Sequence, residues 1–242
     1  MNARTRMIGI AACAAAILAG GCAMTKCESA KGSGAARIVK VACLGDSLTS
    51  GMNMADPERE KYPAQLGALA GIGVEVKGFA IPGRTALRDA ELSVWKEDYF
   101  QAALKWDPDV VVICLGANDC WPAIWQEHGG KFKKDLGDIV AAFARRPSRP
   151  RIWLATPMPF FIPADRFPGN VQLKILEDET VPAVKEVAAV AGVGVIDLHK
   201  PMQGRRELFF PDGVHPNPAG AARMAERVWE AIEPAVAEAR AR

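Results

Sequence analysis

Residues 39–51 read VKVACLGDSLTSG, and this segment decides the fold. It begins as an apolar, β-branched run and stops at Gly45, Asp46 and Ser47, a pattern that is typical of a buried strand ending in a turn. In open α/β sheets, ligands bind at the carboxyl ends of the strands. We therefore expect Ser47 to lie at the ligand-binding edge of a sheet.

Strand-like and helix-like segments alternate along the chain. The predicted strands are residues 38–44, 74–76, 109–115, 151–156 and 193–198. The predicted helices are residues 62–70, 98–105, about 132–143, 173–191 and 218–233. Five strands that alternate with helices indicate a parallel sheet with right-handed crossovers. The predicted fold class is therefore α/β, a three-layer α/β/α sandwich around a five-stranded parallel sheet.

Polar and glycine-containing segments follow several of these strands. Ser47, Gly83, Asn118 and the Asp212–His215 segment each come after a strand, so we expect them to gather at one edge of the sheet. A serine hydroxyl is a poor nucleophile unless a base takes its proton. His215 is the best candidate for that base, because Asp212 lies three residues before it and a tight turn brings the two side chains together.

Four short motifs occur in a fixed order: Gly45-Asp-Ser47-Leu, Gly83, Gly116-Ala-Asn118-Asp and Asp212-Gly-Val-His215. In this order they resemble the motifs of the SGNH hydrolase (GDSL esterase/lipase) family, over nearly all of the chain after the N-terminal segment. The stretches at 62–66, 116–122 and 210–217 resemble bacterial members described as sialate O-acetylesterases or as acetylxylan-esterase-like. The resemblance implies a flavodoxin-like sandwich that hydrolyses esters.

The resemblance also implies a role for each motif residue. Ser47 would attack an ester carbonyl, His215 would take its proton and pass it to the leaving alcohol, and Asp212 would orient the imidazole. The backbone N–H groups of Ser47 and Gly83 and the Asn118 amide would form the oxyanion hole, where losing one donor costs about 2.7–4 kcal/mol. Gly83 would be glycine so that its backbone can approach the oxyanion. No cofactor is implied.

Several other polar residues are expected to be structural. Asp46 and Asp119 should hold their loops by hydrogen bonds rather than transfer protons. His128 and His199 should be structural or exposed, and Asp197, the competing acid, should anchor a loop at a strand end. The chain has three histidines, and they lack the paired spacing of metal ligands, so no metal site is expected.

The cysteines give little information on function. Cys43 and Cys114 each lie two residues before a strand-ending glycine, so we expect them to be buried thiols. Together with Cys27 and Cys120 they lack the close paired spacing of a zinc site. Whether any of them forms a disulfide stays open.

The substrate is indicated by residues in the loops after the strands. The aromatic residues in these loops are Trp121, Trp125, Phe160, Phe161 and Phe167. Such side chains could stack on sugar rings, with Trp121 and Phe160 as candidates, or simply cover the core. Arg84 could pair with a sugar carboxylate, or it could be a solvated surface residue. We favour a secreted serine esterase that removes O-acetyl groups from carbohydrate through an acyl-serine intermediate.

Other functions stay open at this point. A lipase or thioesterase for longer acyl chains would need a deep apolar groove, and a non-catalytic surface carbohydrate-binding protein would keep the fold without turnover. An acyltransferase is a further alternative, because water and sugar alcohols compete for the same acyl-serine. For any of the enzymes, His215 must be neutral to accept a proton, so the rate should fall on the acid side of about pH 6–7.

The N-terminal residues are typical of an export signal. Arg4 and Arg6 precede a short apolar run at 7–19, and small residues lead to Cys22. We expect a lipoprotein-type signal at 1–21, a lipid on Cys22, a flexible tether at 22–36 and one hydrolase domain at 37–242. The expected location is the cell envelope; a plain cleaved signal, with secretion, or an uncleaved anchor are the alternatives.

Net charge and the distribution of apolar segments limit the possible binding partners. Removing two arginines with the signal leaves 28 Lys and Arg against 28 acidic residues, since the whole chain has 30 and 28. A near-neutral chain argues against a nucleic-acid partner, which would require a basic face. No second long apolar segment follows, so the membrane would be reached only through the lipid. We expect a monomer whose only partner is an acylated carbohydrate or another small ester.

Overall fold

One parallel sheet forms the centre of the fold. The computed structural model describes residues 37–162 and 171–242. Its strands are β1 (Val39–Gly45), β2 (Val74–Ala80), β3 (Val110–Cys114), β4 (Arg151–Ala155) and β5 (Gly194–Ile196). They pair in the order β2-β1-β3-β4-β5, with every neighbour parallel. This is the flavodoxin-like order, so the predicted five-stranded α/β fold is confirmed.

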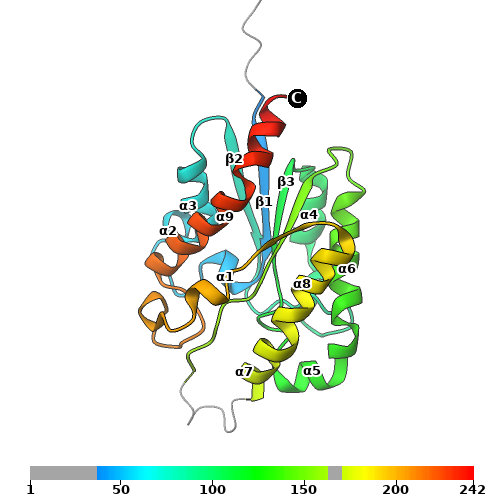
Figure 1. Cartoon of the computed structure of the whole chain (residues 1–242), viewed down its shortest axis with the longest axis vertical. Helices are drawn as coiled ribbons and strands as arrows, with labels where there is room; N and C mark the ends of the chain where they lie inside the picture. Colours follow the sequence, from blue (N-terminus) through cyan, green and yellow to red (C-terminus); the bar gives the residue numbers. More distant parts are fainter. Residues whose placement is uncertain (1–36, 163–170) are drawn as a thin grey trace, which may run out of the picture. The chain divides into compact units, whose positions relative to one another are not determined.

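Helices cover both faces of the sheet. They are α1 (Ser47–Ser50), α2 (Pro57–Glu60), α3 (Tyr62–Ala70), α4 (Asp98–Trp106), α5 (Pro122–His128), α6 (Phe132–Ala144), α7 (Val171–Ile175), α8 (Val181–Ala191) and α9 (Pro218–Arg240). Buried residues of α3 and α9 share one core cluster, and those of α4, α6 and α8 share the other. In Figure 1, α9 crosses in front of β1 and α4 lies behind β3. The three predicted layers are therefore present.

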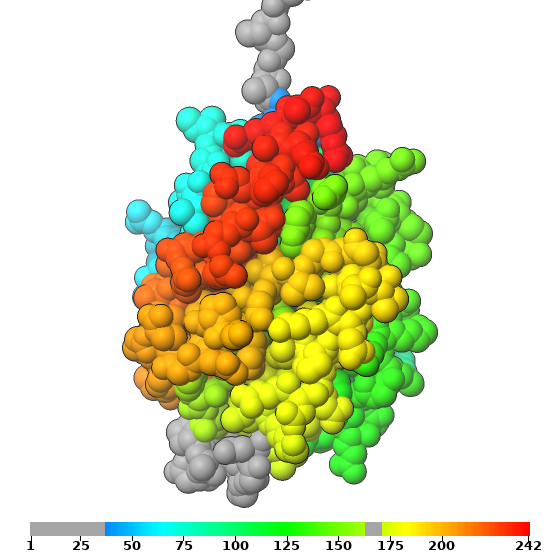
Figure 2. Space-filling model, viewed as in Figure 1, coloured from blue at the N-terminus to red at the C-terminus, as the bar shows by residue number. Residues whose placement is uncertain are grey.

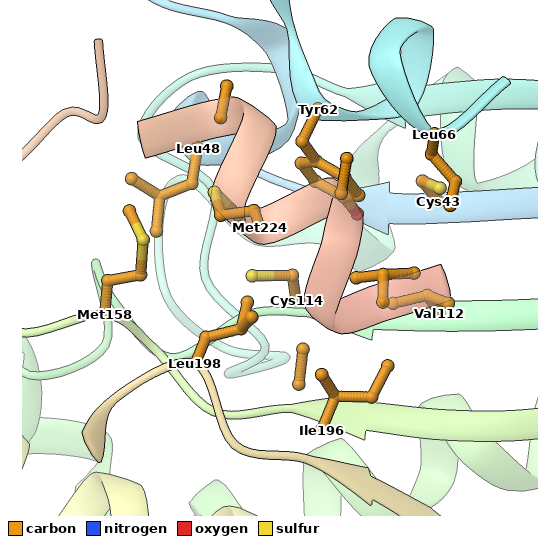
Figure 3. Close-up of a cluster of buried hydrophobic side chains, with 14 of the residues drawn as sticks. Cys43, Leu48, Tyr62, Leu66, Val112, Cys114, Met158, Ile196, Leu198 and Met224 are labelled. Atoms are coloured by element: carbon orange, nitrogen blue, oxygen red, sulfur yellow. The ribbon is translucent and has the colours of Figure 1, made fainter. Parts of the chain in front are cut away.

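The side chains of β1 alternate between the two cores. Val41 and Cys43 face the cluster under α3 and α9, while Ala42 and Leu44 face the opposite cluster. Figure 3 shows Cys43 packed in the first cluster with side chains from α3 and α9. A strand buried on both faces needs apolar residues at every position, and each fully buried valine or leucine contributes roughly 1.5–3 kcal/mol. This burial explains why residues 41–44 of β1 read as a continuous apolar run, whereas Lys40, near the start of the strand, is only half-buried.

Two elements extend beyond their predicted ends. Strand β2 continues past Val76 to Ala80, because its pairing with β1 continues although Lys77 and Gly78 are exposed at the sheet edge. Helix α9 continues through Pro234 to Arg240, since later residues on its inner face remain buried. In both cases tertiary packing outweighs a weak local pattern.

The predicted helix at 173–191 is divided into three parts. Helices α7 and α8 are separated by a π-helical turn at Leu176–Thr180. Pro182 has no N–H to donate to the carbonyl of Asp178, and the wider turn before it accommodates that missing bond.

The N-terminal segment lies outside the described residues. The predicted signal at 1–21, the lipidation site Cys22, the tether at 22–36 and Cys27 all fall there. Among the residues that the structure describes, no helix has both the length and the apolar character needed to cross a bilayer.

Candidate functional site

Ser47 is the first residue of α1, directly after β1. Asp46 caps this short helix, because its Oδ1 accepts the N–H of Leu48 at 2.9 Å. Gly45 leaves no room for a side chain: a Cβ there would lie 2.1 Å from Oγ1 of Thr49. The turn is therefore closely packed, and it places Ser47 at the carboxyl end of β1, beside β3, where the strand order of the sheet reverses; this is the usual ligand position in this fold.

Ser47, His215 and Asp212 form one hydrogen-bonded chain. Nε2 of His215 lies 2.9 Å from Oγ of Ser47, and Nδ1 of His215 lies 2.7 Å from Oδ2 of Asp212. The serine and the histidine are 168 residues apart in the sequence. In this arrangement the imidazole can accept the serine proton while the carboxylate stabilises the imidazolium that forms. The structure thus brings together the three residues that the motifs predicted.

The loop that holds the acid and the base is closed by backbone contacts. The N–H of Phe210 donates to the carbonyl of His215 at 2.8 Å, and the N–H of Phe161 donates to the carbonyl of Gly213 at 2.7 Å. Gly213 has φ +73°, and a Cβ there would lie 2.3 Å from the Phe161 oxygen. Glycine is therefore required at this turn. Figure 2 shows the surrounding segment at the surface, between α9 and α8.

The Asp212 carboxylate is held by several donors. Its Oδ1 accepts the backbone N–H groups of Val214 at 2.9 Å and of His215 at 3.0 Å. Partial burial alone would raise the pKa of Asp212, but these two amides and the His215 ring outweigh burial and lower it. Asp212 is consequently ionised wherever the histidine can act as a base.

The segments predicted for the oxyanion hole are connected through Asn118. Its Nδ2 donates to Oδ2 of Asp46 at 3.0 Å and to the carbonyl of Arg84 at 3.0 Å. The amide has two N–H groups, and both have partners, so binding an oxyanion would require one of these bonds to be exchanged. Gly83 has φ +81°, and a Cβ there would only make an ordinary contact with Leu92 at 3.5 Å. Its backbone conformation is thus what favours glycine.

Two carboxyl groups are fully buried beneath the site. Asp46 binds the Leu48 amide and Asn118, and Oδ1 of Asp119 accepts the N–H groups of Ala86 and Leu87 at 2.9 and 3.2 Å. As predicted, both hold their loops by hydrogen bonds. Burial raises the pKa of each to about 7, and the charge of Asp46 adds to the rise at Asp119.

Asp119→Asn should reduce the pH dependence of stability. The folded pKa of Asp119 lies near 7 and its ordinary value is 3.8, so between these values the folded chain holds more protons than the unfolded chain. Stability contributed by the neutral carboxyl is therefore lost as the pH rises through this window. The asparagine oxygen can still accept the two amides without ionising, so the variant should gain stability relative to the wild type from pH 5 to pH 8.

Thermal unfolding at the two pH values measures this effect. The matched control is Asp89→Asn, because Asp89 is exposed and pairs with Lys131, which lowers its pKa. The control should shift the melting temperature equally at both pH values. Parallel curves for Asp119→Asn and the wild type would contradict the assignment.

With this geometry described, comparison with known proteins identifies the family. Residues 43–223 match the GDSL-like Lipase/Acylhydrolase family. The chain belongs to this family. The predicted SGNH (GDSL) membership is therefore confirmed, and the matched range includes Ser47, Asn118, Asp212 and His215.

An acetylxylan esterase is among the individual relatives of this GDSL-family protein. This chain is 36% identical over 212 residues to the acetylxylan esterase from Xylanibacter ruminicola. The match covers 81% of this chain and 43% of that protein. The chain thus spans less than half the length of that relative. Solved structures that share the fold include the following two. A carbohydrate acetylesterase from Sinorhizobium meliloti has a TM-score of 0.62 at 21% identity, covering 79% of this chain and 97% of that chain. For a lipase/acylhydrolase from Enterococcus faecalis the TM-score is 0.59 at 24% identity, covering 81% and 96%.

Two predicted substrate contacts of this GDSL-family protein need correction. Nε of Arg84 already pairs with Glu97 at 2.7 Å, and the Arg84 guanidinium also binds the carbonyl of Pro82 at 3.0 Å. Its charge is therefore neutralised within the protein, and the suggested pairing with a sugar carboxylate is not supported. Phe160 is only 5% exposed and belongs to the core, so it offers no open face for a sugar ring.

The other loop aromatics lie in different surroundings. Trp121 is half-buried and precedes α5, so its contact with a substrate stays a prediction. Trp125 packs against Phe132 with the ring centroids 5.6 Å apart, and Phe161 packs against Phe209 at 4.9 Å. Phe167 lies outside the described residues. Most of these aromatic side chains therefore pack over the core of the protein.

The remaining polar residues have structural contacts, as predicted. His199 is buried and its Nδ1 donates to the carbonyl of Pro157 at 3.1 Å; burial lowers its pKa. Oδ1 of Asp197 accepts the N–H of His199 at 3.0 Å, which anchors this loop. His128 is half-buried, with Nε2 3.5 Å from Glu127. Within 37–162 and 171–242, no group of three or more His, Cys, Asp or Glu could hold a metal ion.

The three described cysteines are buried free thiols. Cys43 and Cys114 lie in the core as predicted, and Cys120 is also buried. Burial raises the pKa of Cys43 to about 12 and the pKa of Cys114 well above its usual value. Thiols with such raised pKa values remain protonated and are unreactive.

One residue at the site was missed by the sequence interpretation. Nδ2 of Asn53 donates to Oδ2 of Asp212 at 2.7 Å. Asn53 lies in the turn after α1, and no motif of the four includes it. The residue type gives one indirect indication, because asparagine tolerates positive φ in turns. Its partner, 159 residues away, cannot be read from a single sequence.

Proposed function

We propose that this GDSL-family protein is a serine esterase that hydrolyses O-acetyl esters on carbohydrate. The observation that carries the proposal is the hydrogen-bonded chain from Oγ of Ser47 through the His215 ring to Asp212, with separations of 2.9 and 2.7 Å. The acetyl group and the carbohydrate are supported by the 36% identity to an acetylxylan esterase.

Acylation would begin with attack of the Ser47 oxygen on the ester carbonyl carbon. His215 Nε2 takes the serine proton as the C–O bond forms, and Asp212 stabilises the resulting imidazolium. The developing oxyanion would be bound by the backbone N–H groups of Ser47 and Gly83 and by the Asn118 amide. Collapse breaks the bond to the sugar oxygen, which takes the proton from Nε2 and leaves as an alcohol.

Deacylation would repeat these steps with water. His215 Nε2 removes a proton from water, the hydroxyl oxygen attacks the acetyl carbon on Ser47, and a second tetrahedral intermediate forms. Its collapse returns the proton to the Ser47 oxygen and releases acetic acid, which ionises to acetate at neutral pH. The net reaction consumes one water and uses no cofactor.

A panel of esters tests the proposal. Acetylated xylan, other acetylated glycans, nitrophenyl acetate and nitrophenyl octanoate are incubated with the full chain, and released acetate or nitrophenol is measured. We expect acetate from a glycan and faster cleavage of the acetyl than of the octanoyl ester. Faster octanoate cleavage without acetate release from any glycan would instead indicate a lipase or thioesterase. A folded protein that binds glycans and cleaves none of these esters would indicate a non-catalytic binding protein.

A further inference from the structure

Asn53 links the serine turn to the acid of the site. Its Nδ2 lies 2.7 Å from Oδ2 of Asp212, the same oxygen that Nδ1 of His215 approaches at 2.7 Å. The two nitrogens are themselves 3.5 Å apart, as expected for two donors that converge on one acceptor. With the Val214 and His215 amides on Oδ1, the carboxylate accepts four hydrogen bonds.

The position of Asn53 is fixed relative to the serine. The N–H of Met52 donates to the carbonyl of Ser47 at 3.2 Å, which folds the chain back directly before Asn53. Asn53 itself has φ +70°. Asparagine is enriched in this left-handed conformation, which most side chains avoid. The residue type therefore suits both the backbone and the contact with Asp212.

The Asn53–Asp212 contact joins the serine turn to the loop that carries Asp212 and His215, in addition to the hydrogen bond between His215 and Ser47. Asp212 and His215 share one loop, so their mutual geometry is set locally, whereas Ser47 comes from a turn 168 residues away from His215. We propose that Asn53 is a positioning residue: its amide holds the Asp212 carboxylate, and through it the imidazole, at bonding distance from the Ser47 hydroxyl. This inference rests on the proposed esterase function.

Among the described residues, Arg206 and Asp46 are charged or titratable groups bound to the two segments that this contact joins. On the acid–base loop, the Arg206 guanidinium binds the carbonyls of Phe209, Phe210 and Pro211. On the serine side, the buried Asp46 carboxyl binds Asn118 and the Leu48 amide. Neither is hydrogen-bonded to the Asp212 carboxylate, so a new charge at position 53 would act on the Asp212–His215 pair directly.

Two substitutions separate positioning from simple structural support. Asn53→Gly keeps the left-handed backbone and removes the amide. We expect kcat for nitrophenyl acetate to fall roughly tenfold, the size expected for a lost hydrogen bond to a charged group, with little change in KM or melting temperature. Labelling of Ser47 by a fluorophosphonate, in which the serine oxygen displaces fluoride, should slow by a similar factor.

Asn53→Asp keeps the shape and adds a second carboxylate beside the pair. A carboxylate there favours the imidazolium, so the acid limb of kcat/KM against pH should move to higher pH by on the order of one unit. The matched control is Arg149→Gly, which also replaces a residue of positive φ (48°), just before β4 at the opposite end of the strands. This control should change neither kcat nor the pH profile.

The outcomes distinguish the two proposals. Wild-type protein that neither hydrolyses esters nor labels at Ser47 overturns the esterase function, and the positioning role with it. Active wild type with an Asn53→Gly variant that keeps kcat and labelling rate within twofold overturns the positioning role alone. The same follows if Asn53→Asp leaves the acid limb in place, or if Arg149→Gly loses as much activity as Asn53→Gly.

Discussion

Ser47→Ala is expected to lower kcat for ester hydrolysis by roughly 10⁶-fold, the loss typical of removing the nucleophile from a serine–histidine–acid chain. No acyl intermediate can form without the Oγ, while substrate binding is largely retained. The Ser47 side chain is small and 6% exposed, and its hydroxyl is hydrogen-bonded to Nε2 of His215. The fold should therefore be unchanged, which a melting curve can show.

The control for this prediction lies in the same helix. Ser50 is the last residue of α1, and its hydroxyl donates to the Ser47 carbonyl at 3.3 Å. Ser50→Ala should keep kcat within a few-fold of the wild type. A Ser47→Ala variant that retains substantial turnover, or the loss of activity in both variants, would show that the assigned nucleophile is wrong.

Asp212→Asn is expected to lower kcat by roughly 10⁴-fold. The pKa of Asp212 is lowered by its hydrogen bonds, so the native residue presents an anion to Nδ1 of His215. An asparagine can present its NH₂ group to Nδ1 instead, which favours the tautomer with the proton on Nε2. That tautomer has no lone pair free to accept the proton of Ser47.

Asp197→Asn is the matched control for the acid. Asp197 also follows a strand and also accepts backbone amides, at His199 and Lys200, but its charged partner is Lys185 at 2.9 Å. Measured kcat values at a fixed pH should fall for Asp212→Asn and stay near the wild type for Asp197→Asn. A large loss of kcat for Asp197→Asn, with kcat near the wild-type value for Asp212→Asn, would instead identify Asp197 as the acid of the triad.

The fold and the triad could be predicted because their determinants are local in the sequence. Residues 41–44 of β1 and the whole of β3 are buried on both faces of the sheet, so they appear as continuous apolar runs. Parallel topology then places the polar segments that follow the strands at one edge. The Asp212–His215 pair needs only a tight turn. The family motifs then indicate that Ser47 is the serine whose proton His215 accepts.

The parts that could not be predicted depend on contacts between distant residues. Arg84 has its charge neutralised by Glu97, and Phe160 is covered by the rest of the core, although both follow strands as substrate contacts would. Asn53 is polar and lies in a turn, so its pattern is that of an ordinary turn residue. Its partner Asp212 is identified only when the two segments are seen together.

The single loop that carries both Asp212 and His215 has a consequence for how the protein tolerates change. Any insertion, bound neighbour or thermal motion that shifts this loop carries the acid and the imidazole with it as a unit, so their separation is preserved. What changes is the gap from Nε2 to the Ser47 oxygen, now 2.9 Å. A substitution far from the site that moves this loop should therefore slow the attack of Ser47 on substrate, while His215 keeps its proton on Nδ1, next to Asp212.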